Sequence, residues 1–194
     1  MKFLPVLFIV FVLIASSCNS HPKKALPAVA KAEDTAAFYP LNEFLKEQIR
    51  YVDLRNFPLY KITEKNGKRD SASITKDQFI EWAGVFLARE TAFSKTKAAY
   101  RESVFNDRST GSVTLNYQSA DSKTEVQNID VLLDEQTQVV KRVFIRSEYT
   151  RGDTTITEQC NWKADKSFQV NRTLTTKNGY HSTEHNYINW NDKP

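Results

Sequence analysis

The sequence predicts an α+β domain in which two N-terminal amphipathic helices and a β-hairpin pack on a curved antiparallel β-meander of about six to seven strands. Apolar residues at helical spacing, on either side of an Asn-Gly pair, predict the helices and the hairpin. Runs of β-branched and aromatic residues over 100–190, separated by turn residues, predict the meander.

The first helix is expected over residues 40–53. Pro40 suits the first helical turn, where a backbone N–H has no intrahelical partner. Apolar side chains then recur every three or four residues, which places them on one face of a helix. These side chains are Leu41, Phe44, Leu45, Ile49 and Val52. A stripe of this width is typical of a helix that packs on a core.

A hairpin and a second helix follow in order. Asn66-Gly67 lies between two short runs and is the strongest short-range signal for a tight hairpin turn. Thr75 with Gln78 three residues later is a capping box, in which each side chain bonds the other residue's backbone N–H. The capping box predicts a helix over about residues 76–90.

The rest of the chain reads as long strands with short connections. The expected strands are 99–106, 112–119, 124–133, 138–150, 154–163, 167–176 and 180–190. Short connections require antiparallel neighbours, and two-residue alternation leaves one buried face. Long strands should give a twisted sheet that curls, and we expect the two helices to cover its concave apolar face.

The first residues, MKFLPVLFIVFVLIASSC, have the pattern of a secretory signal: Lys2, an apolar run and small residues. The apolar run is shorter than the roughly 20 residues that span a membrane. Small residues directly before Cys18 resemble a bacterial lipobox. The resemblance implies that residues 1–17 are a lipoprotein signal peptide and that Cys18 is lipidated. The alternative is an ordinary secretory signal followed by an incidental cysteine.

Residues 18–37 consist of Cys18, which the lipobox implies is lipidated, and a stretch rich in Ala, Pro and Lys. This composition predicts a flexible tether. Residues 38–194 are expected to form a single α+β domain. The lipobox, the Phe38-Tyr39-Pro40 helix start, the stretch NGKRDSASI and the late triplet Asn161-Trp162-Lys163 together resemble uncharacterised small lipoproteins of Bacteroidota. The resemblance implies a lipoprotein anchored in the bacterial cell envelope. Surface-export signals of Bacteroidota lipoproteins tend to be acidic, and this tether begins without an acidic patch, so the resemblance implies a periplasm-facing protein at either membrane.

Composition narrows the function classes. The chain has 27 basic and 23 acidic residues, a net charge of +4, and the basic residues are scattered. Scattered charge and an export signal argue against nucleic acid as a partner. The sequence has no Gly-rich phosphate loop and no G-x-S-x-G motif, so we expect no cofactor. With Cys18 lipidated, Cys160 is the remaining thiol, expected to pack as a small buried hydrophobe.

The stretch YHSTEH contains H-x-x-E-H, the motif of inverted zinc proteases, through His181, Glu184 and His185. Two-residue alternation after an Asn-Gly turn predicts a strand here, whereas the protease motif lies on a helix. On a strand the two histidines stand about 13 Å apart, at about 3.3 Å per residue. Zinc takes nitrogen ligands at about 2.1 Å, so we expect no metal site and no catalytic residue.

The register of the last two strands decides which polar groups meet. If the Asn-Gly turn carries a bulge, Arg172 lies opposite Glu184 and Phe168 opposite Ile188, which matches charge with charge and apolar with apolar. A tight two-residue turn would instead place Arg172 opposite His185. In the bulged register, Arg172 and Glu184 form either a buried ion pair or a polar pair inside a ligand cup.

Together these observations predict a lipid-anchored, periplasmic cell-envelope protein that acts as a non-enzymatic binding or interaction module. It would contact the membrane through lipidated Cys18 and bind a hydrophobic ligand or another envelope protein. The alternative is a metal-dependent hydrolase that uses His181, Glu184 and His185. A purely structural spacer of the envelope is a third reading.

Overall fold

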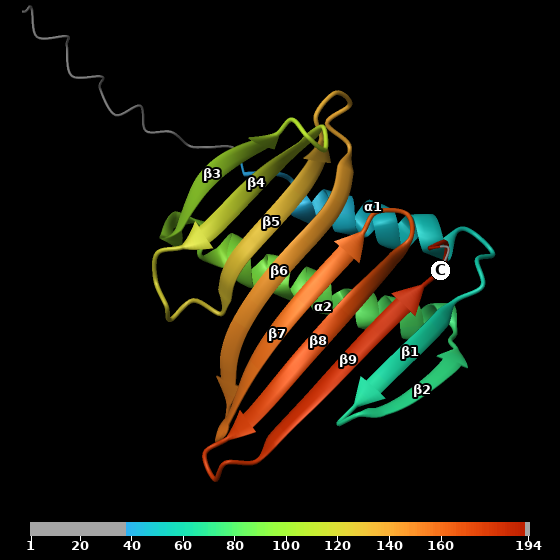
Figure 1. Cartoon of the computed structure of the whole chain (residues 1–194), viewed down its shortest axis with the longest axis vertical. Coiled ribbons are helices and arrows are strands. Elements are labelled where there is room, and N and C mark those ends of the chain that lie inside the picture. The colour runs from blue at the N-terminus through green and yellow to red at the C-terminus, as the bar shows by residue number, and fades with distance from the viewer. Residues whose placement is uncertain (1–37, 193–194) are drawn as a thin grey trace, which may run out of the picture. The chain divides into compact units, whose positions relative to one another are not determined.

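The computed structural model describes residues 38–192, which form two helices and one nine-stranded antiparallel sheet (Figure 1). The predicted signal peptide (1–17), Cys18 and the tether (18–37) lie outside the described residues. The elements are α1 (Leu41–Asp53), β1 (Tyr60–Lys65), β2 (Lys68–Ser73), α2 (Lys76–Lys95), the 3-10 turn η1 (Lys97–Ala99), β3 (Tyr100–Asp107), β4 (Ser112–Ser119), β5 (Val126–Asp134), β6 (Val140–Arg151), β7 (Thr154–Lys163), β8 (Ser167–Thr176) and β9 (His181–Asn189). No helix within 38–192 is long and apolar enough to cross a membrane.

The predicted architecture was wrong in its sheet. The strand order is β2-β1-β9-β8-β7-β6-β5-β4-β3, so one nine-stranded sheet replaces a six-to-seven-stranded meander with a separate hairpin packed on it. The hairpin β1–β2 joins the sheet because β1 pairs with β9, with Tyr60 opposite Asn189 and Lys65 opposite Glu184. This pairing connects the two ends of the domain, and no local sequence pattern encodes it.

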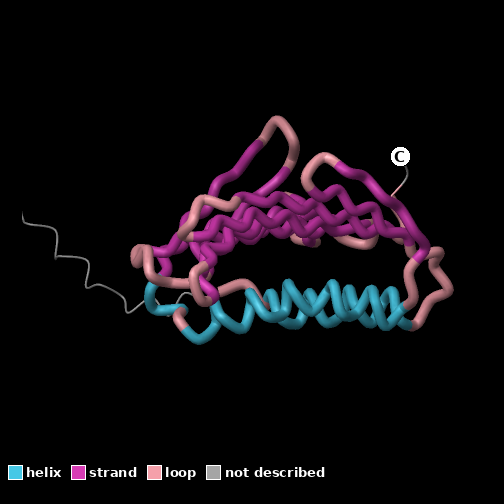
Figure 2. Tube along the Cα trace, turned by 90° about the horizontal axis from the view of Figure 1, so that it is seen from below, coloured by secondary structure: helices cyan, strands magenta, loops and turns pink. Residues whose placement is uncertain are grey.

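The two helices lie on one side of the sheet (Figure 2). We call that side the core face and the other side the open face. No described element covers the open face, from which two hairpin ends rise in Figure 2. Alternation along the strands, interrupted by register shifts between β5 and β6, sends neighbouring side chains to opposite faces, and the open face receives mostly polar side chains.

Helix α2 begins at the predicted capping box. The Thr75 hydroxyl accepts a hydrogen bond from the Gln78 backbone N–H at 3.3 Å, and the Gln78 side chain accepts one from the Thr75 backbone N–H at 2.9 Å. The helix runs to Lys95, beyond the expected end at residue 90. Its apolar face continues to Phe93, which packs edge-on against Tyr100 with ring centroids 4.6 Å apart.

Aromatic side chains fill the space between the helices and the core face. Phe86 meets Trp162 edge-on, with ring centroids 4.9 Å apart, and Trp162 stacks on Phe168 at 4.8 Å. All three side chains are at most 1% exposed. Such ring pairs contribute about 0.5–1.5 kcal/mol each beyond the burial of their area. The interior beneath the helices is therefore a packed core and offers no apolar ligand cup around these rings.

The substitution Phe86→Ala should lower the free energy of unfolding by about 3–5 kcal/mol, because it leaves a cavity between α2 and the sheet. Urea unfolding followed by circular dichroism measures the loss. Ile80→Ala on the same helix is the matched control, because Ile80 is 38% exposed, and it should cost about 1 kcal/mol or less. Equal losses for the two variants would contradict this placement of α2.

Candidate functional site

The bulged register of β8 and β9 is confirmed. Arg172 lies opposite Glu184 and Phe168 opposite Ile188. Gly179 in the connecting turn has φ +86°, a conformation that glycine adopts without strain. The ion pair, however, differs from the expected one. Arg172 also lies opposite Glu158 of β7 and binds that carboxylate at 2.5 Å, whereas Glu184 accepts a hydrogen bond from the Asn186 side chain at 2.8 Å.

Glu158 is the centre of a buried charge cluster on the core face. Its carboxylate is 0% exposed and accepts hydrogen bonds from the Nε of Arg89 at 2.6 Å and the Nε of Arg172 at 2.5 Å. Arg89, on α2, also pairs with Glu125 and lies 4.3 Å from the Tyr149 ring centroid. Two cations and two carboxylates compensate one another here. Arg172 therefore has a structural role, linking β8 to the carboxylate that binds α2.

Cys160 lies next to this cluster, on the same face of β7, and is 2% exposed. Burial raises the pKa of the thiol well above its usual value, and the neighbouring Glu158 carboxylate raises it further. Because the thiolate is the nucleophilic form, a thiol in this environment is inert. The prediction that Cys160 packs as a small buried residue is confirmed.

The three residues of the H-x-x-E-H motif do not converge. All three lie on β9, where His181 and His185 point to the open face and Glu184 to the core face. Both histidines are exposed. Residues 38–192 contain no group of three His, Cys, Asp or Glu side chains that could hold a metal ion. The geometry gives the hydrolase reading no support.

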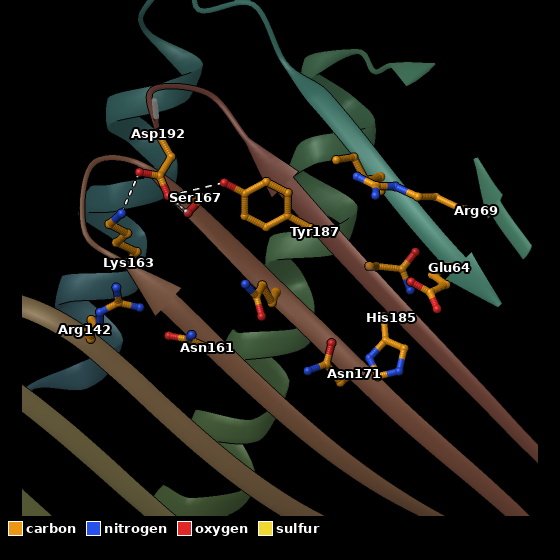
Figure 3. A pocket seen from close by; sticks show the side chains of 13 residues that line it. Glu64, Arg69, Arg142, Asn161, Lys163, Ser167, Asn171, His185, Tyr187 and Asp192 are labelled. Atoms are coloured by element: carbon orange, nitrogen blue, oxygen red, sulfur yellow. Dashed lines mark hydrogen bonds and ion pairs between the residues drawn. The ribbon is translucent and has the colours of Figure 1, made fainter. Parts of the chain in front are cut away.

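A cleft of about 540 Å³ crosses the open face from β2 to β6 (Figure 3). A second cleft, of about 320 Å³, lies over β5 to β8. The two clefts share Asn161, Gln169 and Asn171, which places these amides between them. The sequence alone did not predict these clefts. The available signal was the set of amide side chains at outward-facing positions of two consecutive predicted strands.

Four side chains on adjacent strands form what we call the amide patch: Gln159, Asn161, Gln169 and Asn171. Gln159 lies directly opposite Asn171, and Asn161 directly opposite Gln169. Among the described side chains none of the four has a hydrogen-bonding partner, and the Asn161 Oδ1 is also shielded from solvent. An amide left without a partner in a shielded place costs about 1–3 kcal/mol. This cost falls on the Asn161 carbonyl, whereas Gln159, Gln169 and Asn171 are partly or fully exposed and present their amides to the open face.

Asp192 lies at one end of the larger cleft and bonds three of the side chains that line it. Its carboxylate accepts hydrogen bonds from Lys163 at 2.6 Å, Ser167 at 3.1 Å and the Tyr187 hydroxyl at 3.3 Å (Figure 3). The hydrogen bond from Lys163 holds the pKa of Asp192 below its usual value. Burial, with the Asp192 charge, raises the pKa of Tyr187. The tyrosine therefore stays protonated and its ring is fixed at the cleft.

The charges around the larger cleft nearly balance. Arg69, Arg142 and Lys163 face two carboxylates, Glu64 and Asp192. Arg69 and Glu64 are cross-strand neighbours at the end away from Asp192 (Figure 3). The second cleft adds one cation, Arg146, and one carboxylate, Asp130. The site therefore offers many neutral donors and acceptors and little excess charge.

Comparison with known proteins adds no precedent: no family model, no curated protein and no solved structure matches this chain.

The substitution Glu158→Gln should lower the free energy of unfolding by about 3–5 kcal/mol, because it leaves Arg89 and Arg172 without their buried counter-charge. Urea unfolding at neutral pH measures the change. Glu148→Gln is the matched control: Glu148 is exposed on neighbouring β6, so its loss should stay within about 0.5 kcal/mol. Wild-type stability of Glu158→Gln would show that the cluster does not hold α2.

Proposed function

We propose that this protein is a lipid-anchored cell-envelope protein that acts as a non-enzymatic binding module, with the open-face clefts as its ligand site. The observation that carries the proposal is the amide patch, four amides that line the two clefts and have no hydrogen-bonding partner within residues 38–192. Sites for small molecules are concave and hold a few polar groups that fix the ligand's orientation. The clefts and the amide patch supply both features.

A polar ligand fits better than the hydrophobic one expected from the sequence. An apolar ligand would need space between the helices and the sheet. Trp162, Phe168 and Trp190 fill that space and are each at most 3% exposed. The clefts lie on the other face, among amides and charged side chains. The ligand must therefore match the polar side chains of the open face.

The chemistry of the cleft favours binding over catalysis. Asp192 is engaged by three donors and its pKa is lowered, which makes it a poor general base. His185 lines the cleft from β9, and its cross-strand neighbours there are Asn171 and Glu64. The serine hydroxyl in this cleft that bonds a carboxylate is that of Ser167, and its partner is the same Asp192, while among residues 38–192 no hydroxyl or thiol bonds the ring of His185.

The envelope location rests on the lipobox at Cys18. A lipidated Cys18 would hold the chain at the membrane, and the tether over 18–37 would carry the binding domain into the periplasm. Acyl chains contribute about 0.8 kcal/mol per buried methylene, so more than one chain gives stable anchoring.

For the anchor, we expect the wild-type chain to incorporate a palmitate analogue when it is expressed in a bacterial host, and Cys18→Ala to lose the label and leave the membrane fraction. Click labelling and membrane fractionation measure both effects. Cys160→Ala is the matched control and should keep the label, because Cys160 is buried in the fold. Absence of label on the wild type would contradict the lipoprotein assignment.

For the ligand site, we expect at least one class of small polar molecule to raise the melting temperature, in a panel of amino acids, short peptides, nucleotides and sugars. Asn171→Trp should abolish that rise by filling the floor shared by both clefts. Thr175→Trp is the matched control, on the same face of β8 but outside the lining of either cleft. Persistence of the rise in Asn171→Trp, or no rise with any compound, would contradict the proposed site.

A further inference from the structure

We infer that the ligand is a neutral oligosaccharide, lying across both clefts with hydroxyl groups on the amide patch and ring faces on Tyr187 and Phe144. This inference rests on the proposed binding function and names the ligand class of that same site. It is carried by three features of the open face: the chemistry of the amide patch, one aromatic ring in each cleft and the continuity of the two clefts.

The amide patch matches hydroxyl groups. Each amide offers two N–H donors and a carbonyl acceptor, and each hydroxyl has one donor and two acceptor lone pairs. A row of hydroxyls can therefore bond Gln159, Asn161, Gln169 and Asn171 in both directions at once. Hydroxyls bond both the N–H donors and the carbonyl acceptors without carrying charge into the cleft.

Each cleft also presents one aromatic ring beside its polar groups. Tyr187 lines the larger cleft, and Asp192 holds its hydroxyl, so the ring is fixed in place (Figure 3). Phe144 lines the second cleft and is 39% exposed. A sugar ring has an apolar face of C–H groups and an edge of hydroxyls. Aromatic rings next to amides provide surfaces for both.

Charged ligands and peptides fit less well. An anion would require converging free cations, but Lys163 is held by Asp192 and the charges of the larger cleft nearly balance. An extended peptide is normally recognised by the free backbone of an edge strand. Strands β6 to β9 beneath the clefts each have a partner on both sides, so their backbone groups are already bonded.

The continuity of the clefts implies a ligand of several sugar units. The linings run from β2 to β5, which are six strand spacings apart in the sheet order. At about 4.8 Å per spacing the path is roughly 29 Å long. A monosaccharide could reach one cleft only. Longer chains should bind more tightly, because further units engage the second cleft.

Isothermal titration calorimetry on the detergent-solubilised full chain tests the inference. The probes are glucose, N-acetylglucosamine, the neutral pentasaccharides maltopentaose, cellopentaose and chitopentaose, acidic trigalacturonate and trialanine. At least one neutral pentasaccharide should bind, at least about tenfold more tightly than its monosaccharide. Gln169→Leu and Tyr187→Ala should each weaken that binding about tenfold.

The controls separate a ring contact from loss of fold. Tyr187→Phe keeps the ring and should stay within about threefold of wild type, and Thr175→Leu, outside both clefts, should bind as wild type does. Circular dichroism melts check that each variant is folded. If trigalacturonate or trialanine binds, and Asn171→Trp blocks it while the neutral sugars fail, the inference is wrong and the proposed binding function stands. If no probe binds and the thermal-shift panel is also silent, both fail.

Discussion

The pairing of β1 with β9 is the constraint on which the rest of the structure depends. It places the hairpin β1–β2 at one edge of the sheet, while β3 forms the other edge. Because α2 follows β2 and precedes β3 in the chain, it must cross beneath the whole sheet. Its 20 residues give a length of about 30 Å, comparable with the roughly 38 Å that nine strands span.

Because α2 covers only one face of the sheet, the two faces differ in burial and in polarity. The core face buries aromatic rings, and there the Glu158 carboxylate sits between Arg89 of α2 and Arg172 of β8. Buried ion pairs add little net stability, but an unpaired member costs several kcal/mol. The cluster therefore favours one position of α2 over others along the sheet. The open face keeps polar side chains, and the clefts lie there.

The ligand site follows from the same division. The strands that carry the amide patch, β7 and β8, lie near the middle of the sheet, where both backbone edges are already bonded. Side chains alone therefore make the recognition surface. The hairpin β1–β2 supplies one wall through Ile62, Glu64 and Arg69, so the β1–β9 pairing also completes the larger cleft.

Local pattern in the sequence was enough to predict the capping box at Thr75, the burial of Cys160 and the β8–β9 register, because each depends on neighbours in the chain or across one short turn. The partner of Arg172 was not predictable in this way, since carboxylates lie opposite it on both neighbouring strands and only the packing of α2 selects Glu158. The alternation of apolar with polar residues along these strands predicts that the helices cover the apolar face, but it gives neither the place of the hairpin β1–β2 in the sheet nor the path of α2. Only the tertiary structure decided these, because the contact between β1 and β9 joins the two ends of the domain and sets the path of α2.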